Sequence, residues 1–299
     1  MAVLDRLRSP LAPHDPGIRT LLPDDVPLLR LGRQAVADEV HAAVASYPGR
    51  SVWLPHTLEY VVVTPWRNRE AIGFLGDVSA IRHAEALIRA ACERARAIGD
   101  AMTLMIDLDE ERPRGFYRRA ALDPIERIVT YELRRGAERF APPGAVRFIA
   151  ADPGRPDHLQ ALMEIDRAAF PWLWWNTPQE FAHYGEQMGV ELYLGFLGDT
   201  PVSYCGFTVF LGWAHLDRIA VRPDAQGRGV GRDTLAFAIR ELFRIPVDRI
   251  GLSTQELNER SRRLYEACGF RRSPGYDYCL YGTPHREPAL ALTANATEF

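Results

Sequence analysis

Residues 219–232 read IAVRPDAQGRGVGR, in which an apolar stretch leads into a glycine-rich loop and then into the start of a predicted helix. Glycine stands at positions 227, 229 and 231, where the missing side chain lets the backbone approach a ligand closely and adopt conformations closed to other residues. Successive N–H groups at the start of a helix form an anion-binding site, which the helix dipole strengthens. The loop therefore predicts a site for a pyrophosphate group.

The loop matches neither of two common phosphate-binding loops. Arg228 and Arg232 add fixed positive charge, but the Gly-Lys-Ser/Thr ending of a P-loop is missing. The run Gly227-Arg228-Gly229-Val230-Gly231 also lacks the full dinucleotide fingerprint. For the loop taken alone, the alternative is a tight turn whose glycines serve only packing.

A second motif follows in residues 258–270, which read NERSRRLYEACGF. The run Gln226-x-x-Gly229-x-Gly231 resembles the Gln/Arg-x-x-Gly-x-Gly/Ala signature of the GNAT superfamily of N-acetyltransferases. Residues 258–270 resemble the same family's Asn-x-x-Ala/Ser-x-x-Leu-Tyr-x-x-x-Gly-Phe segment. Both motifs stand in the family's order and at its usual separation, and the resemblance spans residues 145–283 and, more weakly, the first half.

The resemblance implies acetyl-CoA as co-substrate. In this family the glycine loop binds the CoA pyrophosphate through backbone N–H groups, and the strand before the loop splays from its neighbour so that the pantetheine arm can pair with its backbone. The residues that match are Ile219, Ala220 and Val221 for the pantetheine, Asn258 beside it, and Gln226, Gly227, Arg228, Gly229, Val230, Gly231 and Arg232 for the pyrophosphate.

Tyr265 matches the family's tyrosine and is the implied general acid, because a phenol near the thioester sulfur can protonate the leaving thiolate. Its spacing also allows a purely structural tyrosine, since it shares a helical stripe with Ser261, Leu264 and Cys268.

The acceptor amine must lose a proton before it attacks, because an aliphatic ammonium is mostly protonated at pH 7. The family often uses a carboxylate on the strand before the loop. Asp217 is the first candidate for this base and His215 the second, and both point to the same side because strand side chains alternate. The alternatives are a water chain and a structural Asp217 paired with a neighbouring arginine.

The densest aromatic stretch, residues 170–175, lies where members of this family usually build the acceptor site. Its candidate acceptor-binding residues are Phe170, Trp172, Trp174 and Trp175. An aromatic wall there could bind an apolar or cationic acceptor. The alternatives are a hydrophobic hinge packed against the first half and a dimer contact.

The first half repeats the second. Its predicted elements are a helix over residues 81–98, a strand over 102–106, a helix over 112–120 and a closing strand over 128–133. The corresponding elements are a helix over 231–243, a strand over 249–254, a helix over 258–268 and a closing strand over 276–281.

We predict an α/β (α+β) fold of two tandem GNAT-like domains, each a mixed, mostly antiparallel twisted sheet flanked by helices. The predicted parts are an N-terminal tail (1–17), a degenerate domain (18–142), a catalytic domain (143–283) and a C-terminal tail (284–299), with the joint at residues 141–144.

The first copy departs from the family pattern. Where the first copy should have its phosphate loop, residues 71–79 read AIGFLGDVS. This stretch has no Gly-x-Gly and no arginine, and Asp77 would repel phosphate. We therefore predict a first domain without activity that supports the second.

Composition excludes several classes of function. All 36 basic residues are arginine, so no lysine base or Schiff base is available, and neither half is basic enough to suggest nucleic-acid binding. No apolar run approaches the roughly 18 residues of a membrane span, and residues 1–16 lack the apolar core of a signal peptide. The four cysteines are scattered, without metal-site spacing. We expect a cytoplasmic monomer or homodimer without a metal.

These observations favour an enzyme that transfers an acetyl group from acetyl-CoA to a primary amine. One alternative is an acyl-CoA-binding sensor or scaffold without turnover, and another is a nucleotide-binding regulatory protein. The identity of the acceptor does not follow from the fold.

Overall fold

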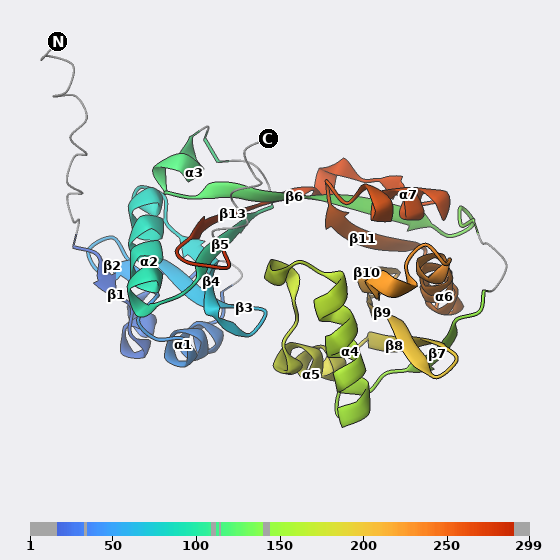
Figure 1. Ribbon diagram of the computed structural model, residues 1–299. Helices are drawn as coiled ribbons and strands as arrows, with labels where there is room; N and C mark the ends of the chain where they lie inside the picture. Colours follow the sequence, from blue (N-terminus) through green and yellow to red (C-terminus); the bar gives the residue numbers. More distant parts are fainter. Residues whose placement is uncertain (1–16, 33–34, 109–111, 114, 140–143, 290–299) are drawn as a thin grey trace, which may run out of the picture.

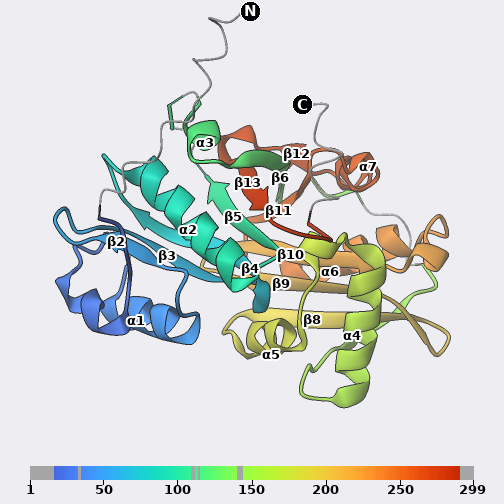
Figure 2. The same cartoon turned by 60° about the vertical axis from the view of Figure 1, so that its left-hand side comes forward.

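The structure is a computed structural model and describes residues 17–32, 35–108, 112–113, 115–139 and 144–289. Within these residues, thirteen strands form one mixed, mostly antiparallel sheet flanked by helices (Figures 1 and 2). The strand order is β1-β2-β3-β4-β5-β13-β6-β11-β10-β9-β8-β7, and β12 pairs with β6 outside this path. The predicted mixed α/β fold is confirmed.

The first half supplies a short 3-10 helix, Pro23–Leu28, and nine further elements. These are β1 (Arg19–Thr20), α1 (Ala37–Ser46), β2 (Val52–Leu54), β3 (Glu59–Trp66), β4 (Arg69–Ser79), α2 (Ala84–Ile98), β5 (Met102–Asp107), α3 (Phe116–Arg119) and β6 (Asp123–Arg134). The helix α2 buries an apolar stripe that includes Leu87, Ile88 and Ala91, as helical periodicity predicts. It ends at Gly99, whose φ of +107° is the left-handed conformation common at helix ends.

The second half repeats this series around the glycine loop. Its main elements are β7 (Arg147–Ala150), α4 (Pro156–Ala169), α5 (Pro178–Glu186), β8 (Val190–Leu197), β9 (Thr200–Val209), β10 (Trp213–Val221), α6 (Val230–Arg244), β11 (Arg249–Gln255), α7 (Glu259–Ala267), β12 (Arg271–Arg272) and β13 (Tyr278–Pro284). Thr177 caps α5 by accepting a hydrogen bond from the backbone N–H of Glu180 at 3.1 Å. The carboxylate of Glu180 accepts a hydrogen bond from Asn68 of the first half.

Helices cover both faces of the sheet around β9 and β10. Tyr204 on β9 packs with the side chains of α4, whereas its neighbour Cys205 packs with those of α6. Because successive strand residues point to opposite faces, this alternation places α4 and α6 on opposite sides. It also explains why β9 is buried almost continuously instead of at every second residue.

The two halves exchange their closing strands. In Figure 1 the green strand β6 leaves the first half and runs along the second, while the red strand β13 lies among the strands of the first half. The strand β6 pairs with β11 from Arg134↔Arg249 to Ile128↔Gln255, and β13 pairs with β5 from Cys279↔Asp107 to Pro284↔Met102. The two predicted sheets are therefore joined into one. The core of the second half includes Val129, Tyr131 and Leu133 of β6.

The strand before the glycine loop splays from its neighbour. The parallel pairing of β10 with β11 runs from Trp213↔Arg249 to Leu216↔Leu252 and stops there, although both strands continue. A register irregularity between Leu216 and Arg218, in the pairing of β10 with β9, falls at the same point and turns β10 away. The result is an open gap between the two strands that leads to the loop.

The predicted position of the degenerate loop in the first half was wrong. Residues 71–79 belong to the strand β4, and the chain between β4 and α2 is residues 80–83. The counterpart in the second half, between β10 and α6, is residues 222–229. Residues 71–79 thus form a strand where a loop was predicted, and the loop of the first half is four residues shorter than its counterpart.

Several predicted segments fall wholly or partly outside the described residues. They are most of the N-terminal tail (1–17), most of the linker at 141–144, residue 114 within the helix predicted over 112–120, and residues 290–299 of the C-terminal tail. The described part of that predicted helix is helical only over Phe116–Arg119.

Candidate active site

The glycine loop adopts the backbone conformation that its sequence predicts. Gly227 and Gly229 have φ values of +78° and +83°, which favour glycine strongly over other residues. Gly229 is the N-cap of α6, so the free N–H groups of its first turn point out of the loop. Gly231 has an ordinary φ, and a side chain there would meet Leu264 and Val221 only at normal contact distances of 3.5 and 3.6 Å. The protein itself therefore does not require glycine at position 231.

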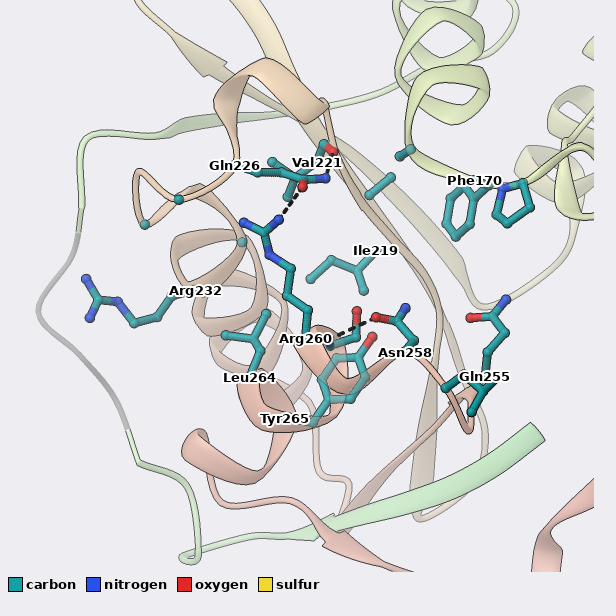
Figure 3. A pocket seen from close by; sticks show the side chains of 18 of the residues that line it. Phe170, Ile219, Val221, Gln226, Arg232, Gln255, Asn258, Arg260, Leu264 and Tyr265 are labelled. Carbon is teal, nitrogen blue, oxygen red and sulfur yellow. Dashed lines mark hydrogen bonds between the residues drawn. The ribbon is translucent and has the colours of Figure 1, made fainter. Parts of the chain in front are cut away.

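Side chains around the loop hold it in place. Gln226 donates a hydrogen bond from Nε2 to the carbonyl of Val221 at 3.1 Å and accepts one at Oε1 from Arg260 of α7 (Figure 3). The side chain of Val230 is buried in a small core with Val202 and Ala225. Gln226 and Val230 thus fix the loop, and what they can offer a ligand is mainly their backbone. Arg228 is exposed.

A cavity of about 820 Å³ opens between the loop, the splayed end of β10 and α7 (Figure 3). Most of the predicted cofactor-binding residues line it. They are Ile219, Ala220, Val221, Gln226, Gly227, Gly229, Gly231, Arg232 and Asn258. Arg228 and Val230 do not line this cavity.

Helix α7 brings two predicted residues to the cavity. Asn258 is its N-cap, and the side-chain oxygen accepts a hydrogen bond from the backbone N–H of Ser261 at 3.1 Å. Tyr265 lies one to two turns further on, with its hydroxyl directed toward Asn258 in Figure 3. Burial raises the pKa of Tyr265 to about 12, so the phenol stays protonated across the physiological range. A protonated phenol that lines a cavity is able to donate a proton.

A second cavity of about 280 Å³ adjoins the first and shares part of its lining, including Phe170, Ile219, Asn258 and Tyr265. Asp217 and His215 line the second cavity, at the irregularity in β10. Asp217 accepts hydrogen bonds from Tyr184 at 2.5 Å and from Thr208 at 2.6 Å, and His215 Nδ1 lies 2.7 Å from its other oxygen. The carboxylate of Asp217 thus pairs with His215 and not with an arginine.

Glu126 also lines the larger cavity, and the sequence did not point to it. It lies on β6, the closing strand of the first half, and its carboxylate accepts a hydrogen bond from Trp174 Nε1 at 2.6 Å. Burial raises the pKa of Glu126 to about 7. Only the strand exchange brings this residue to the second half, so no local signal in the sequence could have identified it.

The aromatic stretch divides between cavity and packing. Phe170 lines both cavities and Trp174 lines the second. Trp172 and Trp175 line neither, because Trp172 stacks under Arg69 of the first half, with 4.3 Å from the guanidinium carbon to the ring centroid, and Trp175 Nε1 donates to the carbonyl of Phe170. Trp172 thus packs against the first half, whereas the hydrogen bond of Trp175 stays within its own segment.

Comparison with known proteins agrees with this geometry. The model of the Acetyltransferase (GNAT) family matches residues 159–270. A relative from Salmonella typhimurium, named ribosomal protein bS18-alanine N-acetyltransferase, is 34% identical over 118 residues, which are 38% of this chain and 76% of the relative. The chain belongs to the GNAT family of acetyltransferases.

Solved structures extend the GNAT likeness to the tandem arrangement. A GCN5-related N-acetyltransferase from Sphaerobacter thermophilus aligns with a TM-score of 0.57 at 18% identity, covering 90% of this chain and 95% of that one. A tandem GNAT protein from the clavulanic acid biosynthesis pathway aligns with the same TM-score at 12% identity, covering 90% and 98%. At these identities the likeness concerns the fold alone.

The first GNAT-like half has its own carboxylate where the second half has an open loop. Before α2, the backbone N–H groups of Ile81 and Arg82 donate to one oxygen of Glu59 at 2.7 and 2.8 Å, and His83 Nδ1 contacts the other oxygen. Both N–H groups lie just before α2, whose N-cap is His83, as Gly229 is the N-cap of α6. The side chain of Glu59 therefore takes the place of an anionic ligand.

The tyrosine of the first half is engaged as well. The Tyr117 hydroxyl donates to Asp107, and its ring stacks on Tyr281 of β13 with a centroid separation of 3.6 Å. The residue that matches Tyr265 is thus covered by the exchanged strand.

The described residues offer neither a metal-binding cluster nor a membrane-spanning helix. No group of three or more His, Cys, Asp or Glu side chains there is arranged to hold a metal ion. Among the same residues, no helix has the length and apolar character needed to cross a membrane.

Proposed function

We propose that this protein transfers an acetyl group from acetyl-CoA to a primary amine. The observation that carries the proposal is the pair of adjoining cavities that both have Tyr265 in their lining. One leads to an anion-binding loop at a helix start, and the other to a hydrogen-bonded His–Asp pair. This arrangement suits a reaction in which a phosphate-bearing donor and an amine meet at one phenol.

The residues of the larger cavity fit acetyl-CoA. The backbone N–H groups at Gly229 to Gly231, with Arg232 nearby, would hold the pyrophosphate, and the open edge of β10 at Ile219 to Val221 would pair with the pantetheine. A Cβ at Gly231 would make only ordinary contacts with Leu264 and Val221, so the packing of the protein does not explain this glycine, whereas close approach of a phosphate would. When bound, acetyl-CoA supplies a thioester carbonyl that an amine can attack.

Side chains of this protein would accept one proton and donate another during the reaction. The C–N bond forms as the C–S bond breaks, the amine loses a proton, and the thiolate gains one, which gives an amide and free CoA. We assign the first proton to His215, held by Asp217, because the carboxylate already accepts hydrogen bonds from Tyr184, Thr208 and His215. We assign the second to Tyr265, whose phenol remains protonated.

A thiol-release assay with acetyl-CoA and a panel of amines tests the proposal. Tyr265→Phe should lower kcat by roughly 10²- to 10⁴-fold, the usual contribution of one proton-transfer group. Tyr131→Phe is the matched control, because Tyr131 is an equally buried tyrosine whose ring lies 6.1 Å from that of Tyr265 and outside both cavities. Acetyl-CoA binding without turnover of any amine would favour the sensor or scaffold instead. Equal effects of the two substitutions would refute the role of Tyr265.

A further inference from the structure

The tip of the β3–β4 hairpin carries an arginine from the first half into the second cavity. Arg67 and Asn68 form the turn, with φ values of +52° and +54°. The hairpin is fixed to the second half by hydrogen bonds from Trp66 Nε1 to the carbonyl of Leu173 at 2.9 Å and from Asn68 Nδ2 to Glu180 at 2.6 Å. Arg67 is therefore held in one place beside the site.

The guanidinium of Arg67 is only partly satisfied. Its Nη1 donates to Asn176 Oδ1 at 2.6 Å, whereas Nε is buried and has no hydrogen-bond partner. The rings of Trp66 and Trp174 lie 5.6 and 5.4 Å from its central carbon. The edge formed by Nε and Nη2 is left without a partner among the described residues.

Arg67 also has no carboxylate of the described residues within ion-pair distance. Two other basic side chains line this cavity, and each has a carboxylate partner. Arg218 pairs with Asp166, and His215 pairs with Asp217. Arg67 forms no ion pair with any described residue. Burial, and next the nearby Arg218, lower the pKa of Arg67 to about 10, and the opposite effect of the Glu180 and Asp166 carboxylates does not offset them.

A carboxylate would satisfy both deficits. The Nε and Nη2 groups of an arginine present two parallel N–H donors, which match the two oxygens of a planar carboxylate. The cavity of about 280 Å³ limits such a ligand to a small molecule. The same cavity is lined by Tyr265 and the His215–Asp217 pair, to which the proposed function assigns the amine.

We propose that Arg67 binds a carboxylate of the acceptor, which makes the substrate a small amino acid-like molecule with both an amine and a free carboxylate. This inference rests on the proposed function. It distinguishes this site from one for a peptide N-terminus, where the neighbouring carboxylate is replaced by an amide and Arg67 would keep its unpaired charge.

The test compares matched acceptors in the thiol-release assay. The panel holds the twenty protein amino acids, the amide of each, O-phosphoethanolamine, a polyamine and a peptide beginning with alanine. We expect kcat/KM for the best amino acid to exceed that for its amide by about 30-fold or more, the usual effect of removing one partner of a buried charge pair. Arg67→Gln should raise KM for that amino acid by a similar factor and abolish the preference, while KM for acetyl-CoA stays unchanged.

Arg69→Gln is the matched control. Arg69 lies in the same hairpin and stacks on Trp172, but it lines neither cavity. We expect this variant to keep the wild-type preference. An equal loss in both variants would mean that Arg67 acts only through the hairpin's packing, and would overturn the inference.

A binding measurement gives an independent readout. The N-acetyl form of each of the twenty amino acids and the corresponding amide are titrated into the full chain without acetyl-CoA, with fluorescence of Trp66 and Trp174 as the signal. Tighter binding of an acid than of its amide, lost in Arg67→Gln, supports the inference. The inference is overturned if acids and amides bind equally throughout. It is also overturned if the enzyme prefers to acetylate the amides, the peptide, the polyamine or O-phosphoethanolamine. Either result leaves the proposed function intact. Absence of turnover with every acceptor refutes the proposed function, and the binding experiment then decides the role of Arg67 alone.

Discussion

Replacing Glu59 by glutamine should destabilise the protein at neutral pH and have little effect in acid. The Glu59 carboxylate accepts two backbone hydrogen bonds at the start of α2 and contacts His83, and its side chain is only 13% exposed. Burial by itself would raise the pKa of Glu59. The hydrogen bonds from His83, Arg82 and Ile81 outweigh that effect and lower the pKa to about 2.

The size of the effect follows from this pKa. The gap between the ordinary value of 4.5 and about 2 is about 2.5, and each pH unit corresponds to about 1.36 kcal/mol, so the charge contributes up to about 3 kcal/mol. Because the folded-state pKa is the lower one, the contribution is fully present above pH 4.5 and is lost as the pH falls toward 2. Glutamine keeps the shape of the side chain but not the charge.

The assay is urea unfolding of the wild type and Glu59→Gln at pH 7, 5 and 3. We expect a free energy of unfolding lower by about 2–3 kcal/mol in the variant at pH 7 and 5, with the difference clearly smaller at pH 3. A difference that is the same at all three pH values would refute the reasoning, because a loss of packing would not depend on the protonation of Glu59. A variant as stable as the wild type at pH 7 would refute it as well.

Two further predictions concern the proton acceptor and the strand exchange. In the thiol-release assay, His215→Gln should lower kcat/KM by about 100-fold or more at pH 7, while Glu126→Gln should keep most of the activity. The reverse order would assign the amine's proton to Glu126, whose pKa of about 7 also suits a base. Residues 143–299 expressed alone should fail to fold cooperatively, because β11 loses its partner β6 and the core loses Val129, Tyr131 and Leu133. A cooperative thermal transition of that fragment would contradict the importance of the exchange.

Local features of the fold were predictable because local sequence determines them. The helix predicted over residues 231–243 is found as Val230–Arg244, and Thr177 caps α5 as its position before Pro178 indicates. The exchange of β6 and β13 was not predictable, since the closing strands of two related halves carry similar alternating patterns and either sheet could accept either strand. Which sheet each strand joins is decided by tertiary packing, and the sequence alone does not show it.

The candidate site divides in the same way. The glycine loop and α7 are continuous motifs, so the sequence identified Gly229, Asn258 and Tyr265, and all three line the larger cavity. Glu126 and Arg67 come from the first half and reach the site through the exchanged strand and the docked hairpin. Their roles depend on contacts between residues far apart in the chain, which no motif spacing records.

Calorimetric titration of acetyl-CoA into the full chain tests the central claim most directly. We predict one site per chain, because Glu59 takes the ligand's place in the first half. We also predict loss of binding in Gly231→Glu, whose side chain would extend toward the pyrophosphate site and repel it. An acidic residue suits the first turn of α6, and a Cβ at position 231 would make only ordinary contacts with Leu264 and Val221, so the variant should unfold near the wild-type midpoint. Two sites per chain, no binding by the wild type, or unchanged affinity in Gly231→Glu would contradict the account.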